Sequence, residues 1–203
     1  MNDLLSPGLT GAYLLPLALV VLLLLYLFVY RRRRRSGRSV DEVVKRIAFE
    51  YLSNLVIPNA DEGEIQIDHL ILTAEGLLVI DVKEVDGTVF GSDKMQDWTV
   101  ISSDRRFTFS NPQPALFDRI AAVKQIVRQV PVTGRILFLG DAEFTKGTPG
   151  LVCKLDDLLA EFGEPDKLAA KAKIEAFKPH WDQILAKSRS ADPLPERRGA
   201  PIV

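Results

Sequence analysis

Hydrophobic and polar residues follow different patterns along the chain, and the first pattern predicts a membrane anchor. Residues 13–30 (YLLPLALVVLLLLYLFVY) form an apolar run without a charged side chain. A helix of this length spans roughly 27 Å, close to the ~30 Å thickness of the bilayer hydrocarbon. Tyrosines lie towards both ends of the run, where their rings favour the headgroup region. The pattern predicts a transmembrane helix over 13–30, preceded by a short N-terminus over 1–12.

Two other interpretations of this apolar run are less consistent with its flanks. A cleaved signal peptide carries basic residues before a shorter apolar core and small residues after it. Here five arginines, Arg31 to Arg35, follow the run instead. A buried core helix would have to hide a surface that is apolar on every side. We therefore interpret the run as an anchor.

The arginines also predict the orientation of the anchor. Basic residues next to a transmembrane helix are retained on the cytoplasmic side, where anionic lipids attract them. Residues 31–39 then form a basic juxtamembrane linker. We expect a single-pass protein of the cell membrane, with the N-terminus outside, the remaining chain cytoplasmic and the lipid bilayer as a partner.

After the linker, helical spacing of apolar residues gives way to strand patterns. Residues 40–48 (VDEVVKRIA) have apolar positions at helical intervals, and Ser39 is a suitable N-cap. Residues 49–57 indicate the end of this helix running into a strand. Residues 58–63 (PNADEG) are typical of a turn.

The next segments predict a sheet. Residues 64–73 and 77–85 read as strands, the second with the continuous apolar run of a central strand. Between them Ala74-Glu75-Gly76 predicts a three-residue hairpin loop, with glycine where a positive φ is needed. Three shorter strands would extend this meander, at residues 87–90, 98–102 and 106–109.

The C-terminal half predicts helices separated by short strands. A helix begins near Pro114 and a buried strand covers 135–140. The other expected elements are a strand at 151–153, a helix at 155–162 ending at Gly163, a helix from Asp166 that Pro179 kinks or divides, and a disordered tail at 188–203. The fold class is α/β (α+β), with one folded domain over residues 40–187.

Composition and charge narrow the function classes. The chain is 47% hydrophobic and 26% charged, with a formal net charge of -1. Because five of its cations are the clustered arginines, the folded domain itself is acidic, unlike a general nucleic-acid coat protein. One cysteine, Cys153, excludes an internal disulfide and, with two histidines, the usual zinc cages. We interpret Cys153, Trp98 and Trp181 as buried side chains.

One group of polar residues suggests chemistry. Asp81 and Lys83 lie two apart at the end of a strand, so their side chains share a face. Asp68 lies on the neighbouring hairpin strand, and Glu42 on the preceding helix can approach from the side. Three carboxylates and a lysine in one cleft suit a Mg²⁺-dependent phosphodiester hydrolase. Exposed cross-strand ion pairs are the alternative.

A longer motif surrounds these residues. Ile67-Asp68-His69 is followed by a strand from Gly76 to Lys83 that contains Ile80-Asp81-Val82-Lys83, and Gly87, Trp98 and Asn111-Pro112 follow in order. This pattern resembles the nuclease-related domain (NERD) family of the PD-(D/E)xK nuclease superfamily. The resemblance covers about residues 40–162 and implies a restriction-endonuclease-like mixed sheet flanked by helices.

The resemblance also implies roles for individual residues. Asp68 and Asp81 would be metal ligands, Lys83 the catalytic lysine and Glu42 the acid of the helix, with Mg²⁺ or Mn²⁺ as cofactor and DNA or RNA as partner. Three positions depart from the family pattern: Asp81 replaces glutamate, Asp41 stands where a glycine precedes the helix acid, and Ala115 stands where glutamine is frequent, with Gln113 two residues earlier. His69 would face the side of its strand opposite Asp68.

Three function hypotheses remain. The first is a membrane-anchored, divalent-metal-dependent nuclease, supported by Asp68, Asp81 and Lys83 together. The second is a catalytically inactive binding or scaffold domain, favoured by the acidic charge and the missing helix glycine. The third is a subunit of a membrane complex with unknown protein partners, although the anchor lacks a G-x-x-x-G face for pairing with itself.

Overall fold

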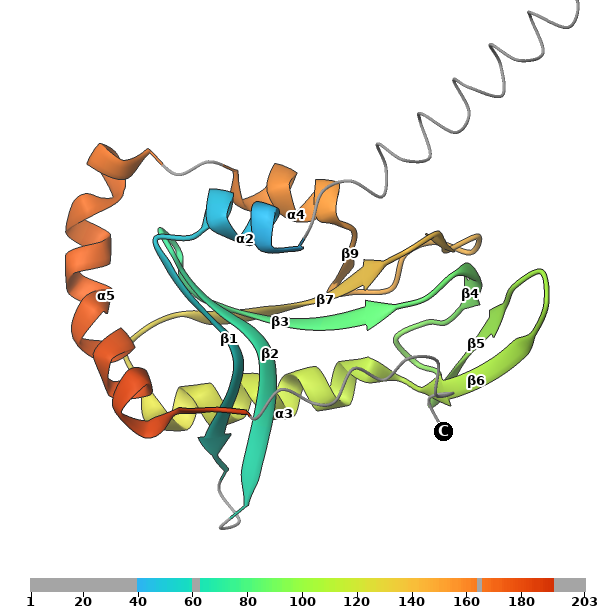
Figure 1. Cartoon of the computed structure of the whole chain (residues 1–203), viewed down its shortest axis with the longest axis horizontal. Coiled ribbons are helices and arrows are strands. Elements are labelled where there is room, and N and C mark those ends of the chain that lie inside the picture. The colour runs from blue at the N-terminus through green and yellow to red at the C-terminus, as the bar shows by residue number, and fades with distance from the viewer. Residues whose placement is uncertain (1–39, 60–62, 164–165, 192–203) are drawn as a thin grey trace, which may run out of the picture. The chain divides into compact units, whose positions relative to one another are not determined.

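The computed structural model describes residues 40–59, 63–163 and 166–191 (Figure 1). The chain divides into two compact units, residues 1–39 and 40–203, and the described residues all belong to the second. The predicted N-terminus, transmembrane helix and basic linker therefore lie outside the described residues. Within those residues, no helix is both long enough and apolar enough to cross a membrane.

The centre of the domain is a six-stranded mixed sheet, as expected. Strands β1, β2 and β3 form an antiparallel meander, and β7 and β9 continue it in parallel from β3. In spatial order the strands are β10 (Arg189–Ser190), β1 (Glu50–Pro58), β2 (Glu64–Thr73), β3 (Gly76–Glu84), β7 (Val132–Leu139) and β9 (Val152–Cys153).

The β2–β3 hairpin forms where it was predicted, with a tighter connection. Thr73 pairs directly with Gly76, which leaves two residues in the turn. Gly76 has φ +128°, and a Cβ there would lie 2.3 Å from the Pro131 carbonyl oxygen. Only glycine avoids both the backbone strain and this clash.

The short strands that were expected to extend the meander form a second, four-stranded sheet instead. Its strands, in spatial order, are β6 (Arg106–Ser110), β5 (Asp97–Ile101), β4 (Gly87–Phe90) and β8 (Ala142–Glu143). The prediction was wrong because β7 pairs with β3 along its whole length as far as Glu84 and occupies the edge that β4 would need. At Gly87, φ +121° lets the chain turn away into the second sheet.

Four helices are described around the sheets: α2 (Val40–Ile47), α3 (Pro112–Ile126), α4 (Leu155–Phe162) and α5 (Lys167–Lys187). In Figure 1, α2 and α4 lie on one side of the six-stranded sheet and α3 on the other. Helix α3 begins two residues before the predicted Pro114, because the Asn111 side chain caps it by accepting a hydrogen bond from the Gln113 N–H at 2.9 Å. Helix α5 is not divided and continues through Pro179.

Two apolar cores lie on either side of this sheet, and β3 contributes to both. Leu77 and Val79 join the core that contains residues of α3 and α5, whereas Leu78 and Ile80 join the core with α2 and α4. All four are at most 1% exposed. The continuous apolar run predicted for a central strand is explained by this burial on both faces.

The C-terminal end differs from the prediction over its first residues. The disordered tail was expected from Ser188, but Arg189 and Ser190 pair with β1 as β10. Arg189 also forms an ion pair with Glu64 at the start of β2. These contacts hold the end of α5 against the edge of the sheet.

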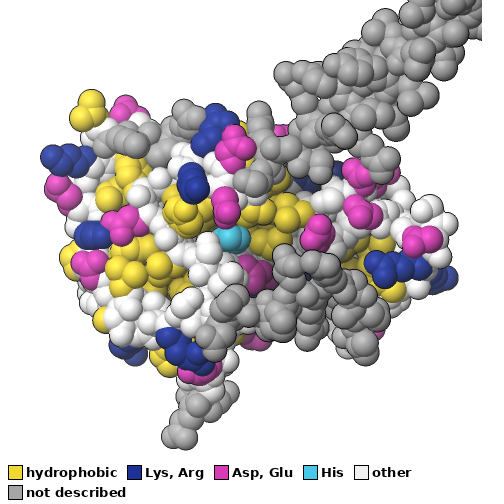
Figure 2. Space-filling model, viewed as in Figure 1, with side chains coloured by type: hydrophobic (Ala, Val, Ile, Leu, Met, Phe, Trp, Pro, Cys, Tyr) yellow, Lys and Arg dark blue, Asp and Glu magenta, His cyan; other side chains and the backbone are white. Residues whose placement is uncertain are grey.

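The charged side chains give the surface no single sign on the side that Figure 2 displays. Acidic and basic groups are interspersed there between apolar areas. On this side, recognition of a phosphate group would depend on a local arrangement of cations.

Candidate active site

Asp81 and Lys83 lie side by side at the carboxyl end of β3, on the face that is turned towards α3. The Lys83 Nζ donates a hydrogen bond to Asp81 Oδ1 at 3.1 Å. Asp81 is 1% exposed, whereas the Lys83 side chain is 29% exposed. The predicted shared face is confirmed, and the lysine lies between a buried carboxylate and solvent.

Asp68 joins this pair where strands β2 and β3 separate. Regular pairing between the two strands ends at His69 and Ile80. Beyond that point the Val82 N–H donates to Asp68 Oδ2 at 2.8 Å, so a side-chain carboxylate replaces the main-chain acceptor of a neighbouring strand. Burial raises the pKa of the Asp68 carboxyl, and the adjacent Asp81 carboxylate raises it further, while the Val82 N–H and Lys83 oppose the shift. The two carboxyl groups are thus neighbours.

The second oxygen of Asp81 is the least satisfied polar atom of the site. Asp81 Oδ2 is buried and has no hydrogen-bond donor among the described residues. Arg119 of α3 places its Nη1 3.8 Å from this oxygen, beyond hydrogen-bond distance. A buried charged oxygen without a donor is costly, commonly about 1–3 kcal/mol or more. The site therefore favours an additional positive group at this oxygen.

Arg119 is held rigidly where it faces Asp81. Its Nε donates to the Gln66 carbonyl oxygen of β2 at 2.8 Å, and its Nη1 to the Ala115 carbonyl oxygen at 2.9 Å. The sequence interpretation did not include this residue. A signal existed, because Arg119 follows Ala115 by four positions and so shares its face of the helix.

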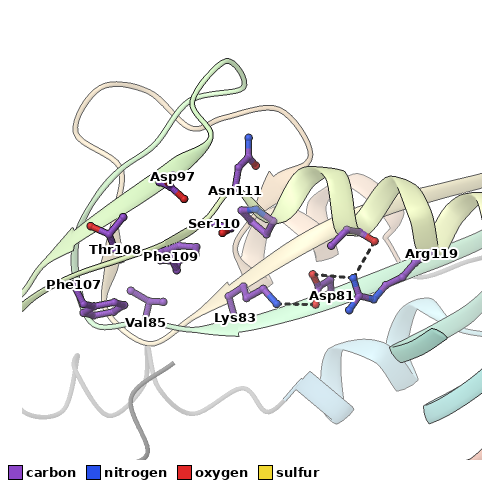
Figure 3. A pocket seen from close by; sticks show the side chains of 12 residues that line it. Asp81, Lys83, Val85, Asp97, Phe107, Thr108, Phe109, Ser110, Asn111 and Arg119 are labelled. Atoms are coloured by element: carbon purple, nitrogen blue, oxygen red, sulfur yellow. Dashed lines mark hydrogen bonds and ion pairs between the residues drawn. The ribbon is translucent and has the colours of Figure 1, made fainter. Parts of the chain in front are cut away.

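Asp81, Lys83 and Arg119 help to line a cavity of about 380 Å³ (Figure 3). In Figure 3 the side chains of Lys83 and Arg119 both point to Asp81, and the rings of Phe107 and Phe109 lie beyond Lys83. The lining residues come from β3 and the residue after it, from β5 and β6, and from the first half of α3 with its N-cap: Asp81, Lys83, Val85, Asp97, Phe107, Thr108, Phe109, Ser110, Asn111, Pro112, Ala115 and Arg119.

Glu42 is not brought to this cluster. It lies on α2, exposed, and α2 packs on the core on the other side of β3 from Asp81. The described residues contain no group of three or more acidic, histidine or cysteine side chains that could hold a metal ion. The structure unites Asp68, Asp81 and Lys83, and the assignment of Glu42 as a ligand stays a prediction.

His69 and Gln113 have structural contacts outside the cavity. The His69 ring hydrogen-bonds with the Ser53 hydroxyl through Nδ1 at 2.9 Å, and burial lowers its pKa. The side chain of Gln113 donates from Nε2 to Asp93 Oδ1 and to the Gly150 carbonyl oxygen, each at 2.7 Å. Gln113 thus connects the start of α3 to two loops. It does not take the place of the glutamine that the family frequently has at the position of Ala115.

The interpretation of Trp98, Trp181 and Cys153 as buried side chains is confirmed. The two tryptophans are at most 1% exposed, and the Trp98 ring packs against Phe109, Phe138 and Phe144. Cys153 is a free, buried thiol, and burial raises its pKa to about 12. None of the three lines the cavity.

The mixed sheet and the carboxylate–lysine pair at the end of a central strand agree with the nuclease-related class that the sequence motif resembles. The model of the family described as "Nuclease-related domain" (NERD) matches residues 34–139, more than half of the chain. The chain therefore belongs to the nuclease-related domain family. Asp68, Asp81, Lys83 and Arg119 all lie within the matched segment.

A more distant similarity links the chain to an uncharacterised protein, pXO1-01, of Bacillus anthracis. The two are 25% identical over 100 residues, which cover 46% of this chain and 47% of the relative. The chain thus spans about half the length of the curated relative it matches. No solved structure matches the chain.

Proposed function

We propose that this protein is a membrane-anchored hydrolase that cuts phosphodiester bonds in nucleic acid with the help of a divalent cation. The observation that carries the proposal is the buried Asp81 Oδ2, which lacks a donor and lies beside a second carboxylate and a lysine. Membership of the nuclease-related domain family supports the substrate class.

The donor set suits a hard cation. Mg²⁺ prefers oxygen ligands and is commonly held by one or two carboxylates together with water and substrate phosphate. Asp68 and Asp81 would be its protein ligands, and the unpaired oxygen of Asp81 fits that role. When bound, such a cation would activate water and offset phosphate charge.

The remaining groups of the cavity suit a phosphate ester. Lys83 is partly exposed and its ammonium group can turn from Asp81 to orient the attacking water or to donate to a phosphate oxygen. Arg119 presents a fixed guanidinium group 3.8 Å from Asp81, and guanidinium groups bind phosphate oxygens in pairs. Both cations oppose the negative charge that develops during hydrolysis.

Activity and its site are tested together. The full chain, purified in mild detergent, is incubated with labelled DNA and RNA, each single- and double-stranded, in Mg²⁺, Mn²⁺ or EDTA. We expect cleavage that requires the cation and is lost in Asp81→Asn. Glu84→Gln is the matched control, because Glu84 is an exposed acid on the same strand with its side chain on the opposite face. Equal activity of Asp81→Asn and Glu84→Gln would remove the proposal.

A second candidate is a catalytically inactive nuclease-like domain that binds or scaffolds at the membrane. The observation that favours it is the position of Glu42, which leaves Asp68 as the one carboxylate described beside Asp81, with no group of three that could hold a metal within the described part of the chain. Calorimetric titration of the full chain with Mn²⁺ separates the candidates further. A scaffold of this kind predicts neither cleavage nor a difference in Mn²⁺ binding between wild type and Asp81→Asn.

The membrane anchor is the other part of the proposal. Its support is the uncharged apolar run of residues 13–30 followed by Arg31 to Arg35. We expect the protein to stay in the membrane fraction after carbonate washing. We expect protease added to intact cells to leave residues 40–187 uncut. Release of the protein by carbonate, or cleavage of the domain from outside the cell, would contradict this topology.

A further inference from the structure

One wall of the cavity is aromatic. Phe107 and Phe109 lie two apart on β6 and so project to the same side, towards Lys83 (Figure 3). Their ring centroids are 6.3 Å apart with 36° between the planes. Both rings are half-buried, and Phe109 rests edge-on against the buried Trp98 at 6.1 Å. The wall is therefore fixed in place and partly open to the cavity.

A guanidinium group lies over the Phe107 ring, although Arg105 itself is not among the residues that line the cavity. The Arg105 guanidinium carbon lies 5.1 Å from the centroid of the Phe107 ring, within the range of a cation–π contact. Arginine planes and aromatic rings are the surfaces on which unpaired bases stack in proteins that bind single strands. The wall has the composition of such a stacking surface.

The polar floor lies deep beside this wall. Asp81 is 1% exposed, and the side chains of Lys83 and Arg119 are 29% and 20% exposed. A cavity of about 380 Å³ is the size of a small-ligand site, where clefts of roughly 300–1,000 Å³ are usual. To reach the floor, a phosphate group must enter the cavity together with its own sugar and base. In a duplex that base is paired and stacked on both faces, so entry requires that it first leave the stack.

We propose that the cavity accepts one unpaired nucleotide, with its base against Phe107 and Phe109 and its phosphate at Lys83 and Arg119, so that the substrate is single-stranded nucleic acid. This inference rests on the proposed function and names its substrate class. The aromatic wall would distinguish single strands from duplexes. It would not distinguish DNA from RNA, because every base has an aromatic face. DNA and RNA therefore enter as separate arms of one test.

The first test compares strandedness in the wild-type full chain. Matched 20-mers of DNA and of RNA are supplied single-stranded or annealed to their complements, in Mg²⁺ or Mn²⁺. We expect initial cleavage rates at least about ten-fold higher for the single strand of one or both sugars, since leaving the stack is least costly there. Equal or faster cleavage of the duplex of both sugars would overturn the inference while leaving the hydrolase intact.

The second test measures binding in an Asp81→Asn background, so that no strand is cut. Fluorescence anisotropy reports the affinity for a labelled single-stranded 10-mer. We expect Phe107→Leu to weaken binding about ten-fold and Phe107→Tyr, which keeps the ring, to bind as before. Phe117→Leu is the matched control, because Phe117 is 56% exposed on α3 and does not line the cavity. Thermal unfolding of each variant checks that it is folded.

These outcomes separate the inference from the function on which it rests. Binding that prefers the single strand and depends on the Phe107 ring, without any cleavage, would support the ligand class and remove the hydrolase. Binding that is equal for both forms of strand, or a Phe107→Leu variant that is folded and binds as tightly as its Phe117→Leu control, would overturn the inference.

Discussion

The two halves of strand β3 differ in what surrounds them. In the first half, Gly76 to Ile80, the strand pairs with β2 on one side and with β7 on the other, and apolar side chains fill both faces. In the second half, β7 continues to pair as far as Glu84, but β2 has separated, and the Asp68 carboxylate takes the place of its backbone at Val82.

This contrast shows how a rigid element can carry reactive groups. The first half is held by burial and by two neighbouring strands. The second half keeps β7 as a neighbour for alignment. Where β2 has separated, the Asp68 carboxylate accepts a hydrogen bond from the Val82 N–H, and on the face towards α3 Asp81 and Lys83 line the cavity. The substitutions below test whether stability belongs to the first half and chemistry to the second.

Leu78→Ala is expected to have the largest effect. Leu78 is fully buried in the core with α2 and α4, and truncation of such a side chain costs about 2–5 kcal/mol. Urea unfolding should show this loss in the free energy of unfolding, while cleavage per folded molecule stays within about two-fold. Leu185→Ala, at a position that is 42% exposed on α5, is the control and should cost far less. A large loss of cleavage per folded molecule in Leu78→Ala would contradict the view that the first half of β3 contributes stability and the second half chemistry.

Arg119→Lys is expected to lower kcat/KM about ten-fold, or about 1.4 kcal/mol. Lysine keeps the charge near Asp81 but loses the Nε bond to the Gln66 carbonyl oxygen and the paired donors for phosphate. Steady-state cleavage is the measurement, with Lys124→Arg elsewhere on α3 as the control. An unchanged kcat/KM would show that Arg119 acts on neither Asp81 nor substrate.

The buried thiol of Cys153 predicts a pH dependence of the free energy of unfolding. The folded thiol has its pKa raised by burial from 9.0 to about 12, so between these values the unfolded chain loses a proton that the folded chain keeps. Stability linked to this thiol is present below pH 9 and falls as the pH rises. From pH 8 to pH 10 the wild type should lose about 1 kcal/mol more unfolding free energy than Cys153→Ala. Parallel losses in both proteins would mean that the thiol is not shielded by the fold.

Asp81→Asn is expected to have the smallest effect on stability although it removes activity. It removes a buried carboxylate that lacks a donor at one oxygen but pairs with Lys83 at the other, so the relief of the unpaired oxygen and the loss of the ion pair oppose each other. The free energy of unfolding should change by no more than about 0.5 kcal/mol, or rise. A loss of 2 kcal/mol or more would assign Asp81 a structural role and weaken the contrast between the halves.

Local patterns in the sequence predicted most of the elements of the domain. The hairpin at Gly76 was predictable because only glycine tolerates its φ, and α4 because Gly163 ends it. The apolar run of β3 indicated a central strand, and its burial on both faces confirms that prediction. The start of α3 was misplaced by two residues, since the cap at Asn111 was not recognised.

Long-range pairings were less predictable. The second sheet was missed because successive strands can pair with each other or leave for another sheet, and the choice depends on which strand takes the free edge of β3. Arg119 was missed for a similar reason: it is 38 residues from Asp81 along the chain, and only the packing of α3 on the sheet brings it within 3.8 Å. Glu42 was assigned to the site because its helix precedes the sheet and because the family resemblance implied an acid there; α2 packs on the other face of β3, and the assignment stays a prediction.

From the sequence alone followed the order and kind of most elements, the motif around Asp68, Asp81 and Lys83 and the shared face of the last two, because these depend on local backbone geometry and on side-chain period. Only the tertiary structure decided the separation of β2 from β3, the unpaired oxygen of Asp81, the position of Arg119 beside Asp81 and the aromatic wall of the cavity. The physical reason is that each of these depends on contacts between segments far apart in the chain, whose free energies are set by the packing of the whole domain and not by any one segment.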